Sequence, residues 1–163
     1  MRSIFRVQNI PAYRVIGLKL DVLFTSIEEI PTLIEQSIQR KKELVDIKEP
    51  HVRYGLSYHT RPDGFVYYSV FHVSEEQEVP PGFVEFVIPE MTYLVTAHEG
   101  GSIEATYMQV NEWLEFSEYV PYTSDDQPYY DALPIKHEKY ETDAERFEIR
   151  IPIINKNYKI VLR

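Results

Sequence analysis

The side chains best suited to chemistry in this sequence are aromatic. It has 13 tyrosines and 8 phenylalanines but a single tryptophan, Trp113. A tyrosine offers a large apolar ring, a hydroxyl group and a ring face that attracts cations. Tyrosine also favours β-strands, which accounts for many of the 13 but not for their concentration around the expected hairpins. The candidate walls of a binding site are Tyr54, Tyr58, Tyr67, Tyr68, Tyr93 and Tyr140.

One carboxylate lies among these aromatic residues near the end of the chain. On an expected strand, Glu138 shares a face with Lys136 and Tyr140, because alternate strand residues point to the same side. A buried carboxylate without a partner is costly, and an organic cation would supply the missing charge. The alternative is a surface ion pair between Glu138 and Lys136 or Lys139. The periodicity alone favours the ion pair.

Other kinds of site find little support in the sequence. The five histidines never reach the spacing of a helical metal-binding pair, and His98 and His137 are expected at the surface or in hinges. With no cysteine, there is no thiolate nucleophile. Gly100-Gly101 fits neither a nucleophile elbow nor a phosphate loop, and better fits a sharp entry to a helix. We therefore expect no cofactor, no metal and no catalytic constellation.

The composition limits the class of protein. The 163 residues, 44% of them apolar, are enough for one domain with a hydrophobic core. No apolar run approaches the roughly 20 residues that span a bilayer, and no secretory signal is recognisable, so we expect a cytoplasmic location. The net charge of −9, with Arg40-Lys41-Lys42 as the only basic cluster, argues against direct binding of nucleic acid.

The elements that would position these residues occur twice. Ile10-Pro11 and Ile88-Pro89 each precede an apolar run, a helix and a pair of tyrosine-rich strands. We expect an α+β domain over residues 1–163, built from strand–helix–strand–strand repeats at about 1–75 and 82–163 that are related by pseudo-twofold symmetry. Both helices would cover one face of an antiparallel sheet. The opposite, concave side would leave a ligand cleft between the halves.

The expected strands lie near residues 3–8, 12–20, 52–60, 64–73, 83–87, 91–98, 133–141 and 146–154. The two helices are expected from about residue 30 to 43 and from about 102 to 117, where apolar residues recur at helical spacing. Trp113 falls near the end of the second helix, and its indole could face either the core or the cleft.

The order of several short motifs is similar to that of a known family. The motifs are Ile10-Pro11-Ala12, Pro62-Asp63-Gly64-Phe65-Val66-Tyr67, Ile88-Pro89, His98-Glu99-Gly100-Gly101, Trp113-Leu114, Glu138-Lys139-Tyr140 and Glu148-Ile149-Arg150-Ile151-Pro152-Ile153. Together they resemble the GyrI-like (gyrase-inhibitor-like) effector-binding domain over nearly the whole chain. That domain forms the ligand-binding half of bacterial multidrug-sensing transcription regulators and also occurs alone. This chain leaves no room for a helix-turn-helix, so we expect the stand-alone form.

The resemblance implies binding of drug-like organic molecules, often lipophilic cations, in an aromatic pocket around a buried glutamate. By its position two residues before a tyrosine on the penultimate strand, that glutamate is Glu138. The resemblance also favours Tyr67 over Tyr68, since adjacent strand residues cannot both face one pocket. The full set of expected ligand-binding residues is Glu138, Trp113, Tyr67, Tyr54, Tyr93 and Tyr140.

Three functions stay open at this point. The first is a stand-alone domain that binds or senses small hydrophobic or cationic molecules. The second is a hydrolase of reactive small-molecule toxins, as some relatives of the domain look to be, with Glu138 as general base. The third is an acidic module that interacts with a DNA-handling enzyme such as gyrase. Turnover of a ligand would indicate the second function, and binding that collapses with salt would indicate the third.

Overall fold

The computed structural model describes residues 4–142 and 144–157. Within these residues the chain forms a nine-stranded sheet and two α-helices. The elements are β1 (Arg6–Ile10), β2 (Tyr13–Leu23), α1 (Glu29–Gln39), β3 (Val52–Arg61), β4 (Gly64–His72), β5 (Val84–Ile88), β6 (Met91–His98), α2 (Ile103–Glu115), β7 (Tyr119–Pro121), β8 (Ile135–Glu141) and β9 (Phe147–Asn155). The sequence predicts all of these except β7. Residue 3, where the first predicted strand begins, lies outside the described residues.

All strand pairs are antiparallel, and the strands follow the order β1-β6-β9-β8-β3-β4-β2-β5, with β7 beside β9. The two halves of the chain contribute strands to this order in the same way, whichever end it is read from. The first strand of each half pairs with the other half, β1 with β6 and β5 with β2, and β3 and β8 meet at the centre. Two repeats would produce this order, although the division at about 1–75 and 82–163 stays a prediction.

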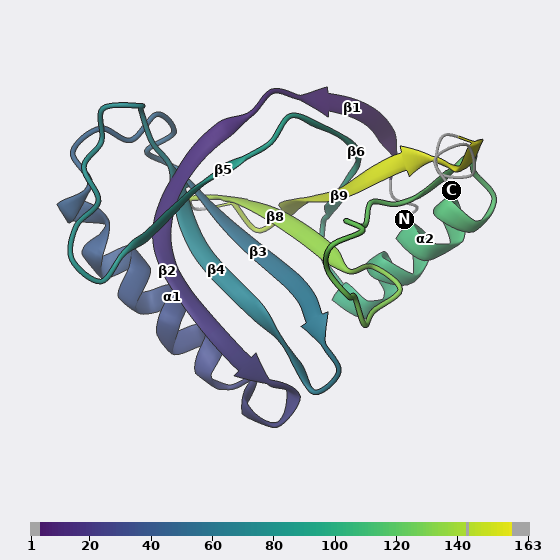
Figure 1. Ribbon diagram of the computed structural model, residues 1–163, viewed down its shortest axis with the longest axis horizontal. Helices are drawn as coiled ribbons and strands as arrows, with labels where there is room; N and C mark the ends of the chain where they lie inside the picture. Colours follow the sequence, from purple (N-terminus) through teal and green to yellow (C-terminus); the bar gives the residue numbers. More distant parts are fainter. Residues whose placement is uncertain (1–3, 143, 158–163) are drawn as a thin grey trace.

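The sheet is curled, with β1 and β5 arching over the other strands (Figure 1). Pro11 and Pro89 lie between β1 and β2 and between β5 and β6, where the chain exchanges one partner strand for another. Proline has no N–H to continue a ladder, which suits it to these breaks. One buried cluster contains Ile88 from β5 with Ile10 from β1 packed against it, although these strands lie at opposite ends of the order. The curl therefore has this face on its inside, and we call it the inner face.

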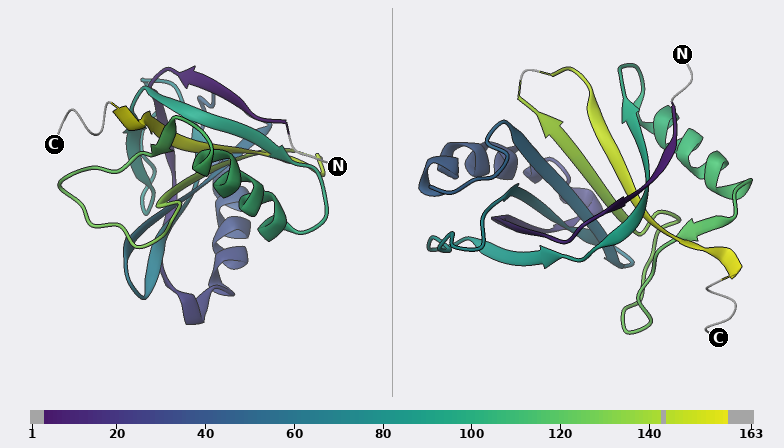
Figure 2. Two further views of the ribbon diagram at one scale, coloured as in Figure 1. Left: turned by 90° about the vertical axis from the view of Figure 1, so that its right-hand side faces the viewer. Right: turned by 90° about the horizontal axis from the view of Figure 1, so that it is seen from above.

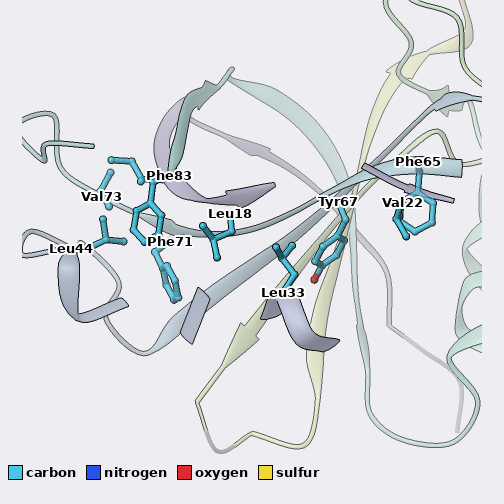
Figure 3. Close-up of a cluster of buried hydrophobic side chains, with 10 residues drawn as sticks. Leu18, Val22, Leu33, Leu44, Phe65, Tyr67, Phe71, Val73 and Phe83 are labelled. Carbon is cyan, nitrogen blue, oxygen red and sulfur yellow. The ribbon is translucent and has the colours of Figure 1, made fainter. Parts of the chain in front are cut away.

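Both helices lie on the other face of the sheet, which we call the outer face (Figure 2). Leu33 of α1 belongs to the cluster that also holds Leu18 and Tyr67 from β2 and β4 (Figure 3). Val110 of α2 packs in a separate cluster with Ile149 of β9. The predicted α+β class, with an antiparallel sheet and helices on one face, is confirmed.

The entry to α2 has the geometry that the paired glycines predict. Gly100 and Gly101 have φ angles of +130° and +74°, a region that residues with a Cβ atom rarely adopt. Ser102 then caps the helix, since its hydroxyl accepts a hydrogen bond from the backbone N–H of Ala105 at 3.2 Å. This turn fixes the direction in which α2 crosses the outer face.

Candidate functional site

The centre of the outer face holds a carboxylate bound by two tyrosines. The carboxylate oxygens of Glu138, on β8, accept hydrogen bonds from the hydroxyls of Tyr107 at 2.5 Å and Tyr140 at 2.6 Å. Tyr140 is two residues further along β8, whereas Tyr107 comes from α2. Burial, followed by the charge of Glu138, raises the pKa of both tyrosines far above the ordinary value. Both hydroxyls therefore stay protonated and act as donors.

The lysines beside Glu138 have other partners. Lys136 donates to Asp131 at 3.2 Å, and Lys139 lies 3.6 Å from a carboxylate oxygen of Glu49. The surface ion pair that the periodicity favours is therefore wrong, and tyrosine hydroxyls hold Glu138 instead. The side chain is half-buried, which leaves part of it accessible from the outer face.

Arg53 on β3 lies on the same face, although the sequence alone does not single it out. Its Nη1 donates to the Tyr67 hydroxyl at 3.2 Å and to Ser69 Oγ at 3.1 Å. Its guanidinium carbon lies 4.5 Å from the centroid of the Tyr140 ring. Strand alternation places Arg53 with Ser57 on one side of β3, but only the pairing of Arg53 with Tyr140 reveals which side.

A glycine makes space at the middle of this arrangement. Gly55 pairs with Glu138 on one side and with Ser69 on the other. A Cβ atom at Gly55 would lie 2.6 Å from the hydroxyl oxygen of Tyr67, so this tyrosine uses space that any other residue would fill. We call Glu138, Tyr107, Tyr140, Tyr67 and Arg53 the central cluster.

Two predicted site residues lie on the opposite side of the sheet. Tyr54 pairs with Lys139 rather than Glu138, so it points to the inner face, where it is 2% exposed and its hydroxyl donates to Glu49 at 2.7 Å. Tyr93 is also on the inner face, packs against His137 with ring centroids 5.7 Å apart, and is fully buried. The structure does not bring either tyrosine to the central cluster.

The inner face, which the sequence predicts to be the open ligand side, is filled over part of its area. The curl brings strands from both ends of the sheet over β3, and their side chains fill the space. The buried residues of this inner core are Tyr13, Val15, Tyr54, Leu56, Val70 and Ile88. The concave side is therefore closed to a ligand around Tyr54 and Leu56 of β3, because the curled sheet packs this part of its inside with its own side chains.

Trp113 is partly exposed and packs against the edge of the core beneath α2. Its ring stacks on Phe5, with centroids 6.1 Å apart, and on Tyr119, with centroids 6.2 Å apart. It is six residues from Tyr107, so the two side chains point to different sides of the helix. Of the two orientations open for this indole, the structure shows the one toward the core.

A second group of tyrosines borders a surface hollow. Tyr58 and Tyr68, both on the inner face, pack edge to face with centroids 5.7 Å apart. With Tyr129 and Asp126 of the loop before β8, they line a cavity of about 390 Å³. This hollow also combines aromatic rings with a carboxylate, so it is a competing position for a cation.

Two histidines expected at the surface are buried. His137 Nε2 lies 3.0 Å from the Tyr58 hydroxyl, and His98 Nδ1 lies 2.8 Å from Thr106 Oγ1. Complete burial, with a smaller effect of Arg150, lowers the pKa of His137 to about 3. His137 is thus a neutral core residue at physiological pH.

The described residues contain neither a metal-binding cluster nor a helix that could cross a membrane. Between residues 4 and 157, leaving out 143, no three His, Asp or Glu side chains gather closely enough to hold a metal ion. In the same part of the chain, no helix has the length and apolar character needed to cross a membrane.

Comparison with known families gives a clear result. Residues 5–154, nearly the whole chain, match a family described as the GyrI-like small molecule binding domain. The chain belongs to this family. It is therefore a GyrI-like small-molecule-binding domain, as the resemblance of its motifs implies.

Individual relatives agree with this assignment. The transcriptional regulator BrlR of Pseudomonas aeruginosa is 33% identical over 97 residues, which are 58% of this chain and 35% of BrlR. The EcmrR C-terminal domain is 18% identical with a TM-score of 0.67, over 95% of this chain and 99% of that one. SAV2435, whose structure was determined bound to tetraphenylphosphonium, is 11% identical with a TM-score of 0.64, over 95% of this chain and 96% of that one. The similarity to the two solved structures, EcmrR and SAV2435, shows that this chain shares their fold.

Proposed function

We propose that this GyrI-like domain binds a lipophilic, drug-like organic molecule at the central cluster, with a cationic group of the ligand beside Glu138. The observation that carries the proposal is the half-buried carboxylate held by the Tyr107 and Tyr140 hydroxyls. A carboxylate has about four acceptor positions, so two donors leave room for a cation. Each aromatic ring face would add about 0.5–2 kcal/mol to the binding of that cation.

The comparison with SAV2435 supports a ligand of this kind. That protein shares the fold over nearly its whole length, and its structure holds tetraphenylphosphonium, an organic cation. At 11% identity the likeness does not carry over individual contacts. The ligand class of this domain therefore needs its own measurement.

Two carboxylate variants test the position of the cation. The probe is the ethyl ester of rhodamine B, a fluorescent aromatic cation, titrated with protein while its anisotropy is followed. We expect saturable binding to the wild type and affinity at least about tenfold lower for Glu138→Gln, because a charge-assisted contact is lost. Asp126→Asn removes one carboxylate from the hollow beside Tyr58 and Tyr68, and is expected to bind as the wild type does.

The opposite results would overturn this assignment. If Asp126→Asn loses the probe and Glu138→Gln keeps it, the cation binds in the hollow. If the wild type binds neither this probe nor tetraphenylphosphonium, the small-cation hypothesis fails. Thermal unfolding of each variant separates a lost contact from a lost fold.

The other two functions stay predictions that the same samples can test. As a hydrolase, the domain would use Glu138 as general base to activate water, and mass spectrometry of the incubated ethyl ester would show rhodamine B, the free acid left when ethanol is released, which Glu138→Gln does not form. As an acidic partner of a DNA-handling enzyme, it would bind that enzyme with an affinity that falls steeply with salt.

A further inference from the structure

We infer that the ligand carries an acidic group as well as a cationic one, and that Arg53 binds the acidic group. This inference rests on the proposed function, since it assigns the second half of the same site. The ligand class is thus an amphoteric aromatic compound, rather than a simple lipophilic cation.

The first argument is the unusual state of Arg53. The structure describes seven arginines, and six of them lie within 4 Å of a carboxylate: Arg6, Arg14, Arg40, Arg61, Arg146 and Arg150. Arg53 has no carboxylate partner among the described residues, and its recorded hydrogen bonds go to two neutral hydroxyls. A guanidinium has five donors in a fork that matches a carboxylate, so Arg53 retains capacity for an anion.

The second argument is the position of the two charges around one ring. The guanidinium of Arg53 lies over the face of Tyr140, and the hydroxyl of the same tyrosine donates to Glu138. A positive group over the ring face and a negative group at the hydroxyl therefore lie beside the same tyrosine. A ligand with its acid and its cation on either side of a flat ring system would meet both groups.

The third argument concerns competition. Arg53 already occupies a ring face that a bare cation would use, and like charges at close range repel. Ser69, one of its two hydroxyl partners, is itself hydrogen-bonded to Ser37 of α1 at 2.6 Å, so the guanidinium is connected to a packed element. A ligand carboxylate would convert this repulsion into a bidentate contact without moving the arginine.

A matched pair of probes isolates the acidic group. Rhodamine B has a free carboxylate beside its cationic ring system, and in its ethyl ester a neutral, slightly larger ester group replaces that charge. We expect the wild type to bind rhodamine B at least about tenfold more tightly than the ester. Arg53→Met keeps an apolar stem but removes the charge, and is expected to abolish or reverse this preference. Arg53→Lys is expected to restore a smaller preference of the original direction.

Controls make the result specific to Arg53. Lys19→Met removes one positive charge from an exposed position of β2 that pairs with Tyr68, on the inner-face side, and is expected to leave the preference unchanged. Thermal unfolding of Arg53→Met is expected to stay within a few degrees of the wild type.

The inference and the proposed function can fail separately. If the preference for rhodamine B is absent, or is the same in Arg53→Met, Arg53 does not bind the acidic group. If Arg53→Met gains affinity for the ester and leaves rhodamine B unchanged, Arg53 only excludes cations, and the inference is again wrong. In both cases a loss of ester binding in Glu138→Gln would keep the proposed function. If the wild type binds neither probe, both proposals are overturned.

Discussion

At the scale of single residues, the central cluster depends on neutral hydroxyl groups, which donate to Glu138 and accept from Arg53, more than on ion pairs. The Glu138 carboxylate and the Arg53 guanidinium are both bound by hydroxyl groups, and the two charges form no ion pair with each other within 4 Å. Hydroxyls fix the position of a charge without neutralising it. Each charge is therefore held in place while remaining able to bind an opposite charge on a ligand.

Gly17 on β2 and Gly55 on β3, the two strands that flank β4, differ in what a side chain would meet, which leads to a prediction. In Gly55→Ala the new Cβ would lie 2.6 Å from the Tyr67 hydroxyl, the far end of a side chain. In Gly17→Ala it would overlap the backbone carbonyl oxygen of Ser69. We expect Gly55→Ala to change the free energy of unfolding by less than about 1 kcal/mol, and Gly17→Ala to lower it by about 3 kcal/mol. Urea unfolding monitored by circular dichroism measures both.

The same pair should separate stability from binding. Gly55→Ala displaces the hydroxyl that Arg53 contacts, so we expect weaker binding of rhodamine B in a protein that is nearly as stable as the wild type. Equal stability losses in the two variants would contradict this account of the space around Tyr67.

At the scale of elements, the start of α2 determines where Tyr107 meets Glu138. Tyr107 lies in the second turn of α2, five residues after the capping serine. The glycine turn and the cap therefore connect a local sequence motif to the geometry of the carboxylate. The corresponding element of the first half, α1, covers β2 and β4 and borders the cluster through Ser37.

Loss of the helix cap should be measurable. Ser102→Ala removes the acceptor for the Ala105 N–H, and we expect a loss of about 1 kcal/mol, equivalent to a melting temperature lower by about 2–4 °C. Ser102→Asp keeps an acceptor and places a negative charge at the helix N-terminus, so it should unfold at or above the wild-type temperature. A melting temperature that is the same for Ser102→Ala and the wild type would show that the cap contributes little.

At the scale of the whole molecule, the curl of the sheet creates a second, buried core that contains titratable groups. His137 lies inside it, beside Tyr58 and Tyr93. A histidine buried this deeply can take up a proton only at a cost to the stability of the folded state. The free energy of unfolding of the whole domain therefore depends on pH in part through this one side chain.

The direction of this pH dependence follows from the pKa of His137 in the two states. The pKa of His137 is about 3 in the folded protein and about 6.5 in an unfolded chain, so the unfolded state binds the proton first. The stabilisation from keeping His137 neutral is complete above about pH 6.5 and is lost as the pH falls toward 3. By pH 5 the loss is roughly 2 kcal/mol. We expect His137→Gln to show a smaller decrease in unfolding free energy between pH 7 and pH 5 than the wild type.

Two comparisons make this measurement specific. Burial, together with the charge of Lys136, lowers the pKa of His59 to about 4, but this contribution is common to both proteins and cancels in the difference. His51→Gln makes the same exchange at an exposed position and serves as the matched control for replacing a histidine by glutamine. Identical slopes for the wild type and His137→Gln would mean that His137 is not held neutral.

The sequence by itself determined the local parts of this protein. Alternating apolar residues, the Pro62-Asp63-Gly64 turn and the Gly100-Gly101 entry predict the hairpins and helices, because these features depend on neighbours a few residues apart. Alternation also places Glu138 and Tyr140 on one face of β8. The ordered motifs predict the GyrI-like family, which the comparison confirms.

Only the tertiary structure decided which faces meet. Tyr54 and Glu138 lie on adjacent strands, and a shift of one residue in their register would exchange the face to which Tyr54 points. Arg53 reaches Tyr140, and Tyr107 reaches Glu138, through strand pairing and helix packing between segments far apart in the sequence. Alternation shows that residues of one strand share a side, but it does not show which side is covered, curled inward or open. Those depend on the register and curvature of the whole sheet, and so does the composition of the binding site.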